Sequence, residues 1–476
     1  MNGGGFVNDS FDNYFAAVKN SFCDCADLIT RVVGKSGARF ALLFIKGITS
    51  REYVSEMVLR PLLRAELSGF SGDFAGMLES VSLSVPSDCA FACDSVAKGE
   101  ALVMVESANG FYCVLANIQA GPSRSVQEPT SDVTVRGPKA GFVEDAETNM
   151  ALLRKYIRTS SLKFRQFAVG SVSSTRVVLG YVEGRADKKL VEDIAQRISA
   201  LNASVITDSA NLSMLLTGKR DRLLPTCGST EKVDKAASKL MSGRIAVIVD
   251  GSPFVLTLPF VFAESIQASD DYLHTPYYAT FIRMLRFTAF VAAIFAPAVL
   301  CAAVNYDPSK LPEELYGIIA ESRKDIPLSF FWEISAILLL FELLREVGVR
   351  MPRTVGDAVG IVGSIILGNT AVEAGIVSSV GVITVAFSAV CAFITPSYMY
   401  VIVLLRLAVL VLAEMFGLYG IGFGVAAFLF LLCGKESFGV PYMSPIAPFD
   451  IKGMQDFIFC WPKKTLGRKE RLGERN

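Results

Sequence analysis

The sequence predicts a mixed α/β and α-helical membrane fold, in which a cytosolic N-terminal region of two similar α/β subdomains precedes a polytopic helical membrane domain. Composition is the first reason: 52% of the 476 residues are hydrophobic and 19% are charged, so the chain is too apolar for a purely soluble protein. The second reason is a change at about residue 286, where short apolar runs give way to long ones. The third is that the part before this change resembles itself in two halves.

The N-terminal half has the pattern of buried strands separated by turns and helices. Its apolar runs are short and broken by charge, as at residues 40–45 and 245–249, which is typical of strands. The strand, glycine turn and helix that start at residue 41 resemble those that start at residue 177, and residues 94–115 resemble residues 238–258. We therefore expect an N-terminal extension (1–38), a first α/β subdomain (39–118), a linker with a connecting helix (119–165) and a second α/β subdomain (166–262).

The C-terminal half contains six apolar segments. Residues 287–304 carry no formal charge and approach the roughly 20 residues that a helix needs to cross a bilayer. Lys and Arg residues flank the first two segments and fill the tail, which predicts that both chain ends are cytoplasmic and that the number of full crossings is even. Either all six segments cross, or one or two are re-entrant. We expect a juxtamembrane elbow (263–286), a transmembrane domain of four to six helices (287–435) and a cytosolic basic tail (436–476).

Composition and motifs disfavour several classes of function. Lys plus Arg and Asp plus Glu both number 46, so no global basic field favours nucleic acid. The single histidine, His274, excludes sites that need two imidazoles. The ten cysteines have no framework spacing and fit reduced thiols better than disulfides or zinc. No phosphate-binding or dinucleotide-binding glycine motif opens a helix after a strand, so we expect no enzyme activity, cofactor or metal.

A glycine-rich segment at residues 355–379 is the most informative stretch of the membrane half. Small residues recur there at every fourth position, so one helix face carries almost no side chain. Such a face either packs two helices of one subunit or lines a channel, and an acidic side chain in a pore favours cations. The residues leave both interpretations open. The candidate pore-lining residues are Gly356, Gly360, Ser364, Gly368, Asn369 and Glu373.

Ionisable residues also occur at membrane depth, where each would be costly if it faced lipid. They should therefore face protein or water, and they are Glu333, Glu342, Arg406 and Glu414. Arg345 follows Glu342 at i+3 and offers it a partner on the same helix. Arg406 and Glu414 lie eight positions apart, on roughly one helix face, and we expect structural pairing with neighbouring helices rather than transport.

The elbow combines prolines, aromatic residues and charges in a way that is typical of a membrane interface. Its charged residues surround His274, but a single imidazole among acids is weak support for a metal or acid/base site. The charged candidates in the elbow are Glu264, Asp270, Asp271, Arg283 and Arg286.

Several long motifs occur in a fixed order along the chain. They are RGPKAGFVEDAETNMALLRKYIR, DGSPFVLTLPFVFAESIQASDDYL, TFIRMLRF, FELLREVGVRMPRTVGDAVGIVGSIILGNTAVEAGIVS, FITPSY and SFGVPYMSPIAPFD. On these motifs, from about residue 39 to residue 450, the chain resembles the A subunits of bacterial spore germinant receptors (GerA type) and their relatives encoded with the stage V sporulation proteins (SpoVAF type).

The resemblance implies a protein of the inner spore membrane that senses nutrients together with a transporter-like B subunit and a lipoprotein C subunit. It further implies a homo-oligomer, a pentamer in this family, that forms a channel for monovalent cations and releases ions early in germination, with residues 355–377 as the pore candidate. Where relatives have glutamine, this chain has Asn369 and Glu373, which can change the ion preference. The alternative is a non-conducting scaffold or signalling subunit that assembles with a transporter-like nutrient-binding partner.

Overall fold

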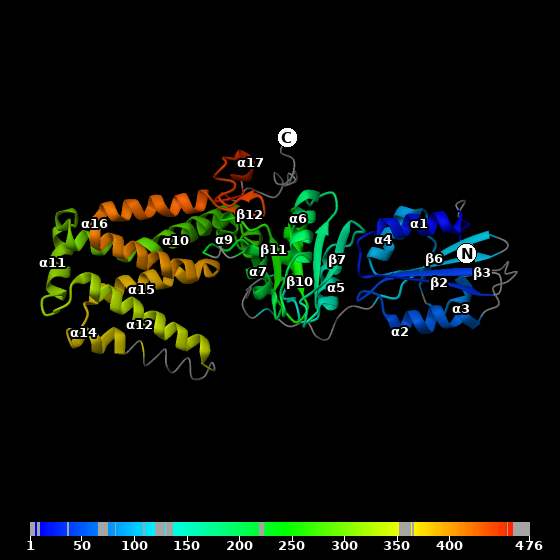
Figure 1. The fold of residues 1–476 in the computed structure, drawn as a ribbon, viewed down its shortest axis with the longest axis horizontal. Helices are drawn as coiled ribbons and strands as arrows, with labels where there is room; N and C mark the ends of the chain where they lie inside the picture. The colour runs from blue at the N-terminus through cyan, green and yellow to red at the C-terminus, as the bar shows by residue number, and fades with distance from the viewer. Residues whose placement is uncertain are drawn as a thin grey trace.

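The computed structural model describes residues 5–6, 10–35, 38–64, 75–80, 82–107, 110–119, 129, 137–218, 223–351, 363, 366–454 and 456–459. Within these residues, two α/β units and a bundle of helices lie in a row along the long axis of the molecule (Figure 1). The second α/β unit lies between the first unit and the bundle. This order confirms the predicted fold class of two α/β subdomains followed by a helical region.

The first unit is an antiparallel sheet with helices on both faces. The strands lie in the order β1-β6-β5-β3-β2, and β4 pairs with β6. Helices α1 and α4 cover one face, and the segment α2-η1-α3 covers the other. The elements are β1 (Gly5–Phe6), α1 (Phe11–Ser21), β2 (Leu28–Lys35), β3 (Ala38–Ile45), α2 (Arg51–Tyr53), η1 (Val54–Leu59), α3 (Arg60–Arg64), η2 (Ala75–Met77), β4 (Leu83–Ser84), α4 (Cys89–Ala97), β5 (Ala101–Ser107) and β6 (Gly110–Ala116).

The second unit repeats this arrangement. Its antiparallel strands lie in the order β7-β8-β10-β11-β9, so β7, β8, β10 and β11 take the places of β2, β3, β5 and β6. Helices α5 and α8 cover one face, and α6 and α7 cover the other. The elements are α5 (Ala146–Tyr156), β7 (Leu162–Val169), β8 (Thr175–Val182), α6 (Lys188–Ser199), α7 (Ser209–Thr217), β9 (Gly228–Thr230), α8 (Val233–Met241), β10 (Ile245–Val249) and β11 (Val255–Leu258).

Both units begin earlier in the chain than the sequence analysis expected. Strand β2 pairs with β3 from Leu28 opposite Ile45 to Lys35 opposite Ala38, and α1 packs in the core of the first unit, so most of the expected N-terminal extension belongs to that unit. Helix α5 was expected to be part of a linker. Its apolar residues instead enter the core of the second unit together with α8. The physical reason is that each sheet needs a helix layer on this face, and α1 and α5 supply it together with α4 and α8.

The helical region begins with the elbow and continues as long apolar helices. Among the described residues, two stretches are long and apolar enough to cross a membrane, namely Pro276–Asn305 and Pro396–Cys433. The elements are α9 (Ala263–Ile266), η3 (Ser269–Leu273), α10 (Pro276–Asn305), η4 (Pro308–Lys310), α11 (Glu313–Ser322), α12 (Phe330–Arg350), η5 (Ile366–Thr370), α14 (Ala371–Glu373), α15 (Ser379–Phe393), η6 (Pro396–Tyr398) and α16 (Met399–Cys433). Helix α10 therefore starts inside the expected elbow, which ended at residue 286.

Helix α16 consists of two antiparallel arms. Gly417 has φ 59° and ψ −138°, a conformation outside the helical region. A methyl group on Gly424 would lie 3.2 Å from Cγ2 of Val409, although in a straight helix these residues would be about 22 Å apart. The two arms correspond to the last two of the six apolar segments expected in the C-terminal half.

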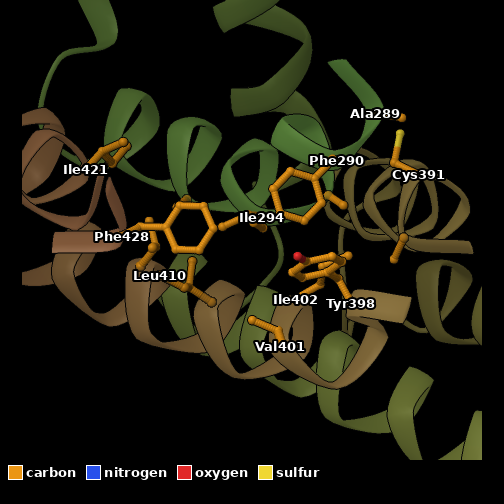
Figure 2. Packing of buried hydrophobic residues seen from close by; sticks show 14 of the residues in the cluster. Ala289, Phe290, Ile294, Cys391, Tyr398, Val401, Ile402, Leu410, Ile421 and Phe428 are labelled. Carbon is orange, nitrogen blue, oxygen red and sulfur yellow. The ribbon is translucent and has the colours of Figure 1, made fainter. Parts of the chain in front are cut away.

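The core of the bundle lies between α10, α15 and the two arms of α16. Phe290 of α10 packs in a tilted or edge-on manner against Tyr398 and Phe428, with ring centroids 5.5 and 6.2 Å away (Figure 2). Ile294 and Leu410 lie in the same cluster and are almost completely buried. These contacts hold the middle of α10, the start of α16 and the end of α16 together.

The chain after α16 returns to the second α/β unit, and we call residues 436–459 the C-terminal clasp. It contains the short strands β12 (Glu436–Ser437) and β13 (Val440–Pro441) and the helix α17 (Ile451–Met454). The clasp lies at the end of the bundle that adjoins the second unit (Figure 1). Tyr442 and Phe457 of the clasp are buried in the core of the bundle. This part of the expected basic tail is therefore folded against the bundle.

Candidate functional site

The structure describes half of the candidate pore residues. The described ones are exposed: Gly368 and Asn369 in η5, and Glu373 in α14. Beside them, Ala371 and Val372 pack against the core of the bundle. This short segment therefore has an apolar side that faces the bundle and a polar side that faces outward. The remaining three lie outside the described residues: Gly356, Gly360 and Ser364.

Glu333 lies at the start of α12 in a fully buried position, with 0% of its surface exposed. One carboxylate oxygen accepts a hydrogen bond from the backbone N of Ser378 at 2.8 Å and another from the Ser378 hydroxyl. The other oxygen lies 3.2 Å from Nε of Arg323. Ser378 caps the N-terminus of α15, so Glu333 joins the starts of α12 and α15 at one end of the bundle.

Glu342 lies near the middle of α12 between two arginines. Its carboxylate is 2.5 Å from Arg345 on the same helix and 2.8 Å from Nη2 of Arg406 on α16. Arg406 is 1% exposed, and its Nη1 donates to the Ser388 hydroxyl of α15 at 3.0 Å. The Ser388 hydroxyl in turn donates to the Ala293 carbonyl of α10 at 2.8 Å. This polar chain connects four helices in the interior of the bundle.

Glu414 lies beside the turn at Gly417, next to the end of α10. Its carboxylate accepts a hydrogen bond from Asn305 Nδ2 at 2.8 Å, and the Tyr306 hydroxyl donates to its backbone carbonyl. Among the described residues, Glu414 accepts from a neutral amide, whereas Arg406 contacts a carboxylate. Glu333 and Glu342 have different partners, as their spacing on α12 indicates. All four intramembrane candidates thus take part in contacts between helices, whereas Glu373 forms no ion pair within the described part of the chain.

The elbow charges lie in two clusters. Glu264 of α9 lies 2.8 Å from Lys239 and 2.7 Å from Arg244, both in the second α/β unit. Burial opposes ionisation of Glu264, but the two cations hold its pKa below the ordinary value. Burial also lowers the pKa of Lys239, against the opposing effect of Glu264. Glu264 therefore fastens the elbow to the second unit.

The second cluster fastens the elbow to α10. Asp271 accepts from Nε of Arg283 at 2.9 Å and from Nη1 of Arg286 at 2.8 Å. Arg283 is 0% exposed and also contacts Asp456 of the C-terminal clasp at 3.1 Å. Asp270 forms no ion pair among the described residues. In that part of the chain, no three His, Cys, Asp or Glu side chains gather to hold a metal ion.

Sequence reasoning missed the clasp residues that complete these clusters. Their partners in the elbow and the second unit precede them by about 180 residues or more along the chain. The pairs are Phe260 with Ser437, Tyr272 with Asp456, and Pro225 with Tyr442. Spacing along the chain does not reveal a contact at that separation. The signal that was present is the motif SFGVPYMSPIAPFD, which contains Ser437 and Tyr442 and ends at residue 450.

An open groove of about 1090 Å³ separates the two α/β units. One wall comes from the end of α1 and the turn after it, and the other comes from β7 and α6. Arg165 spans the groove's edge, with its guanidinium 2.8 Å from Asp24 and 2.9 Å from Glu192. Nearby, Arg154 of α5 forms a buried pair with Asp27 of the first unit, with side chains 0% and 1% exposed.

Comparisons with known proteins identify a family and several similar proteins. A family model described as Bacillus/Clostridium GerA spore germination protein matches residues 16–472. The chain is 33% identical to spore germination protein KA of Bacillus subtilis over 96% of this chain and 85% of that protein. It is 32% identical to the uncharacterized membrane protein YfkQ of the same organism over 94% of this chain and 88% of that protein. A solved structure, the N-terminal domain of the A subunit of the Bacillus megaterium spore germinant receptor GerK3, aligns with TM-score 0.41 and 23% identity over 55% of this chain and 99% of that chain.

Proposed function

This chain belongs to the Bacillus/Clostridium GerA family of spore germination proteins, and from this premise we propose that it is an A-type subunit of a nutrient germinant receptor. In this proposal the subunit lies in the inner spore membrane with both chain ends in the cytoplasm. It assembles into a homo-oligomer, a pentamer by resemblance, and forms a ligand-gated channel for monovalent cations. Its partners are a transporter-like B-type subunit and a C-type lipoprotein subunit.

The observation that supports the channel best is the outward position of one polar segment. Asn369 and Glu373 lie on the exposed surface of the subunit, whereas the buried charges of the bundle contact partners within it. Elsewhere the exposed surface of the long helices is rich in large apolar side chains, such as Ile383 and Leu404. A carboxylate that faces lipid is costly, so Glu373 is best placed where further subunits surround a wet axis.

The helix arrangement supports the proposed topology. The starts of α12 and α15 meet at one end of the bundle, where Tyr306 after α10 also contacts Glu414 near the turn of α16. The opposite end carries the start of α10, the end of α16 and the two α/β units (Figure 1). With the α/β units in the cytoplasm, α10 leads outward and the last arm of α16 leads back, so both chain ends share one side. We retain residues 287–435 as the proposed transmembrane domain.

The decisive experiment is cation release from liposomes that contain the full chain at equal incorporation. Wild type should release potassium, Glu373→Gln should be less cation-selective because the pore loses its negative charge, and Ser364→Leu should block release. Glu346→Gln is the matched control, because Glu346 is an exposed acid on α12 that pairs only with Arg350 at i+4 among the described residues. It should conduct like wild type.

The same experiment identifies the alternative function. Oligomers that remain silent, even when reconstituted with both partner subunits and nutrient, would contradict the channel and indicate a non-conducting scaffold. If wild type and Glu373→Gln release cations with the same selectivity, the channel remains supported but Glu373 does not line its pore. Cysteine substitutions in the glycine-rich segment, tested with a water-soluble thiol reagent after removal of native thiols, would then locate the wet face.

We also propose a second role for the groove between the α/β units, which is the binding of a small zwitterionic molecule. The specific observation is that Arg165 forms ion pairs with Asp24 and Glu192 at the edge of the groove. An amino acid would exchange these pairs for its own, with its carboxylate on Arg165 and its ammonium on one of the two carboxylates. Calorimetric titration of the full chain with amino acids tests this role. Arg165→Met should abolish the heat of binding, and Lys188→Gln, an exposed position on the same unit, should retain it.

A further inference from the structure

The C-terminal clasp connects the end of the bundle to the second α/β unit through buried hydrogen bonds. The Ser437 hydroxyl donates to the Thr226 carbonyl at 2.8 Å and accepts from the backbone N of Phe260 at 3.0 Å. The Tyr442 hydroxyl donates to the Pro225 carbonyl at 2.9 Å. Ser437 and Tyr442 are both 0% exposed. The clasp is therefore an integral part of the boundary between the unit and the helices.

The same segment is bound to the elbow and to α10 by charge. The Asp456 carboxylate accepts from the Tyr272 hydroxyl at 2.8 Å and from Nη1 of Arg283 at 3.1 Å. Arg283 Nη1 also donates to the backbone carbonyls of Asp456, at 2.8 Å, and Phe457, at 3.2 Å. The Arg283 guanidinium lies over the Tyr272 ring, 5.2 Å from its centroid. One carboxylate thus touches both the elbow and the first turns of α10.

Without the clasp, a single covalent path would join the second unit to the helices. That path contains only two short helices, α9 with four residues and η3 with five. Ion pairs of Glu264 in α9 and of Asp271 in η3 fix the two ends of the elbow, and the residues between these two points form a hinge. A second connection through the clasp restrains that hinge, so a displacement of the unit is passed to α10 instead of being absorbed in the elbow.

We infer that the C-terminal clasp is a coupling element that transmits movement of the second α/β unit to the start of helix α10, with Asp456 as its positioning residue. The inference rests on the proposed function only in that a gated channel needs such coupling. The charges explain the choice of residue: Arg283 and Arg286 face two carboxylates, Asp271 and Asp456. Neutralising Asp456 leaves an excess of positive charge around a fully buried guanidinium, which is strongly destabilising.

Hydrogen exchange of the full chain in liposomes tests the inference without requiring any conductance. Asp456→Asn should raise exchange at least about tenfold not only in the clasp but also in the elbow and in the first turns of α10. It should also raise exchange around residues 224–230, which the clasp contacts. Glu436→Gln is the matched control, because it removes an exposed acid from the same clasp, and it should exchange like wild type. Asp456→Glu should restore most of the protection.

Each outcome bears on the inference separately from the channel. Faster exchange confined to residues 451–459 would overturn the coupling role, because the clasp would then be a local tail. If Asp456→Asn fails to fold, Tyr272→Phe tests the coupling role instead. This variant keeps the ion pair between Arg283 and Asp456 and removes one hydrogen bond to Asp456. It should raise exchange a few-fold in the elbow and α10 together. Potassium release measured in the same vesicles, with both partner subunits and nutrient present, reports on the channel, and its absence in wild type would contradict the proposed function while leaving the exchange result intact.

Discussion

The buried ion pair between the two α/β units offers the sharpest test of how the units are joined. Arg154 on α5 donates from Nε to Asp27 at 2.7 Å and from Nη2 at 3.0 Å. Its Nη1 donates to the Thr159 carbonyl at 3.1 Å, and the guanidinium lies 5.2 Å from the centre of the Phe164 ring. Burial disfavours the charged guanidinium, but Asp27 keeps the pKa of Arg154 above its ordinary value.

Asp27→Asn should destabilise the junction by about 3–5 kcal/mol, because it leaves Arg154 charged and buried without a counter-ion. At about 1.4 kcal/mol per factor of ten, this increases the opening equilibrium by roughly two to four orders of magnitude. The double variant Asp27→Leu, Arg154→Met removes both charges and should recover most of the loss, since an apolar replacement of a buried pair is often neutral or stabilising.

The assay is hydrogen exchange of the full chain, followed on peptides from β2, α5 and β7, which surround the pair. The matched control is the exposed pair of Arg39 and Asp12, whose side chains are 46% and 70% exposed. Its removal by Asp12→Asn should change the stability little, because solvent screens an exposed ion pair. The reasoning would be refuted if Asp27→Asn cost no more than this control, or if the double variant were as unstable as Asp27→Asn alone.

Three further predictions concern the helices and the elbow. Glu342→Gln should destabilise the bundle by about 3–5 kcal/mol, because Arg406 loses its interhelical counter-ion; thermal unfolding in detergent measures the loss, and an unchanged midpoint would contradict it. The pKa of Glu264 in the folded protein lies below its ordinary value of 4.5, so its ionised carboxylate stabilises the fold when the pH is above that ordinary value. This stabilisation should be lost as the pH falls through the lower folded-state pKa. Hydrogen exchange in the elbow should become faster over this pH range in wild type but not in Glu264→Gln. Gly417→Ala should cost about 1–3 kcal/mol because of its positive φ, whereas Gly422→Ala, where nothing lies within 4 Å of the added methyl, should stabilise the helix slightly.

The repeat and the apolar segments were predictable because each depends on local patterns. Alternating and continuous apolar runs indicate which residues are buried, and turn glycines indicate where the chain reverses. For the same reason, Arg345 could be foreseen as a partner of Glu342, since a separation of three positions on a helix guarantees proximity. The boundaries were less accurate: neither β2 nor α5 shows in its own sequence that a sheet formed by later residues needs it.

The order of the parts follows from local sequence patterns: two similar α/β units, a charged elbow and a set of apolar helices with ionisable residues that need partners. Which partners those residues have depends on how distant elements pack. Arg406 meets Glu342 from 64 positions away, and Arg283 meets Asp456 from 173 positions away. Local periodicity specifies that a side chain is buried, but the identity of the group that neutralises it depends on how distant elements pack, and that information is spread over the whole chain.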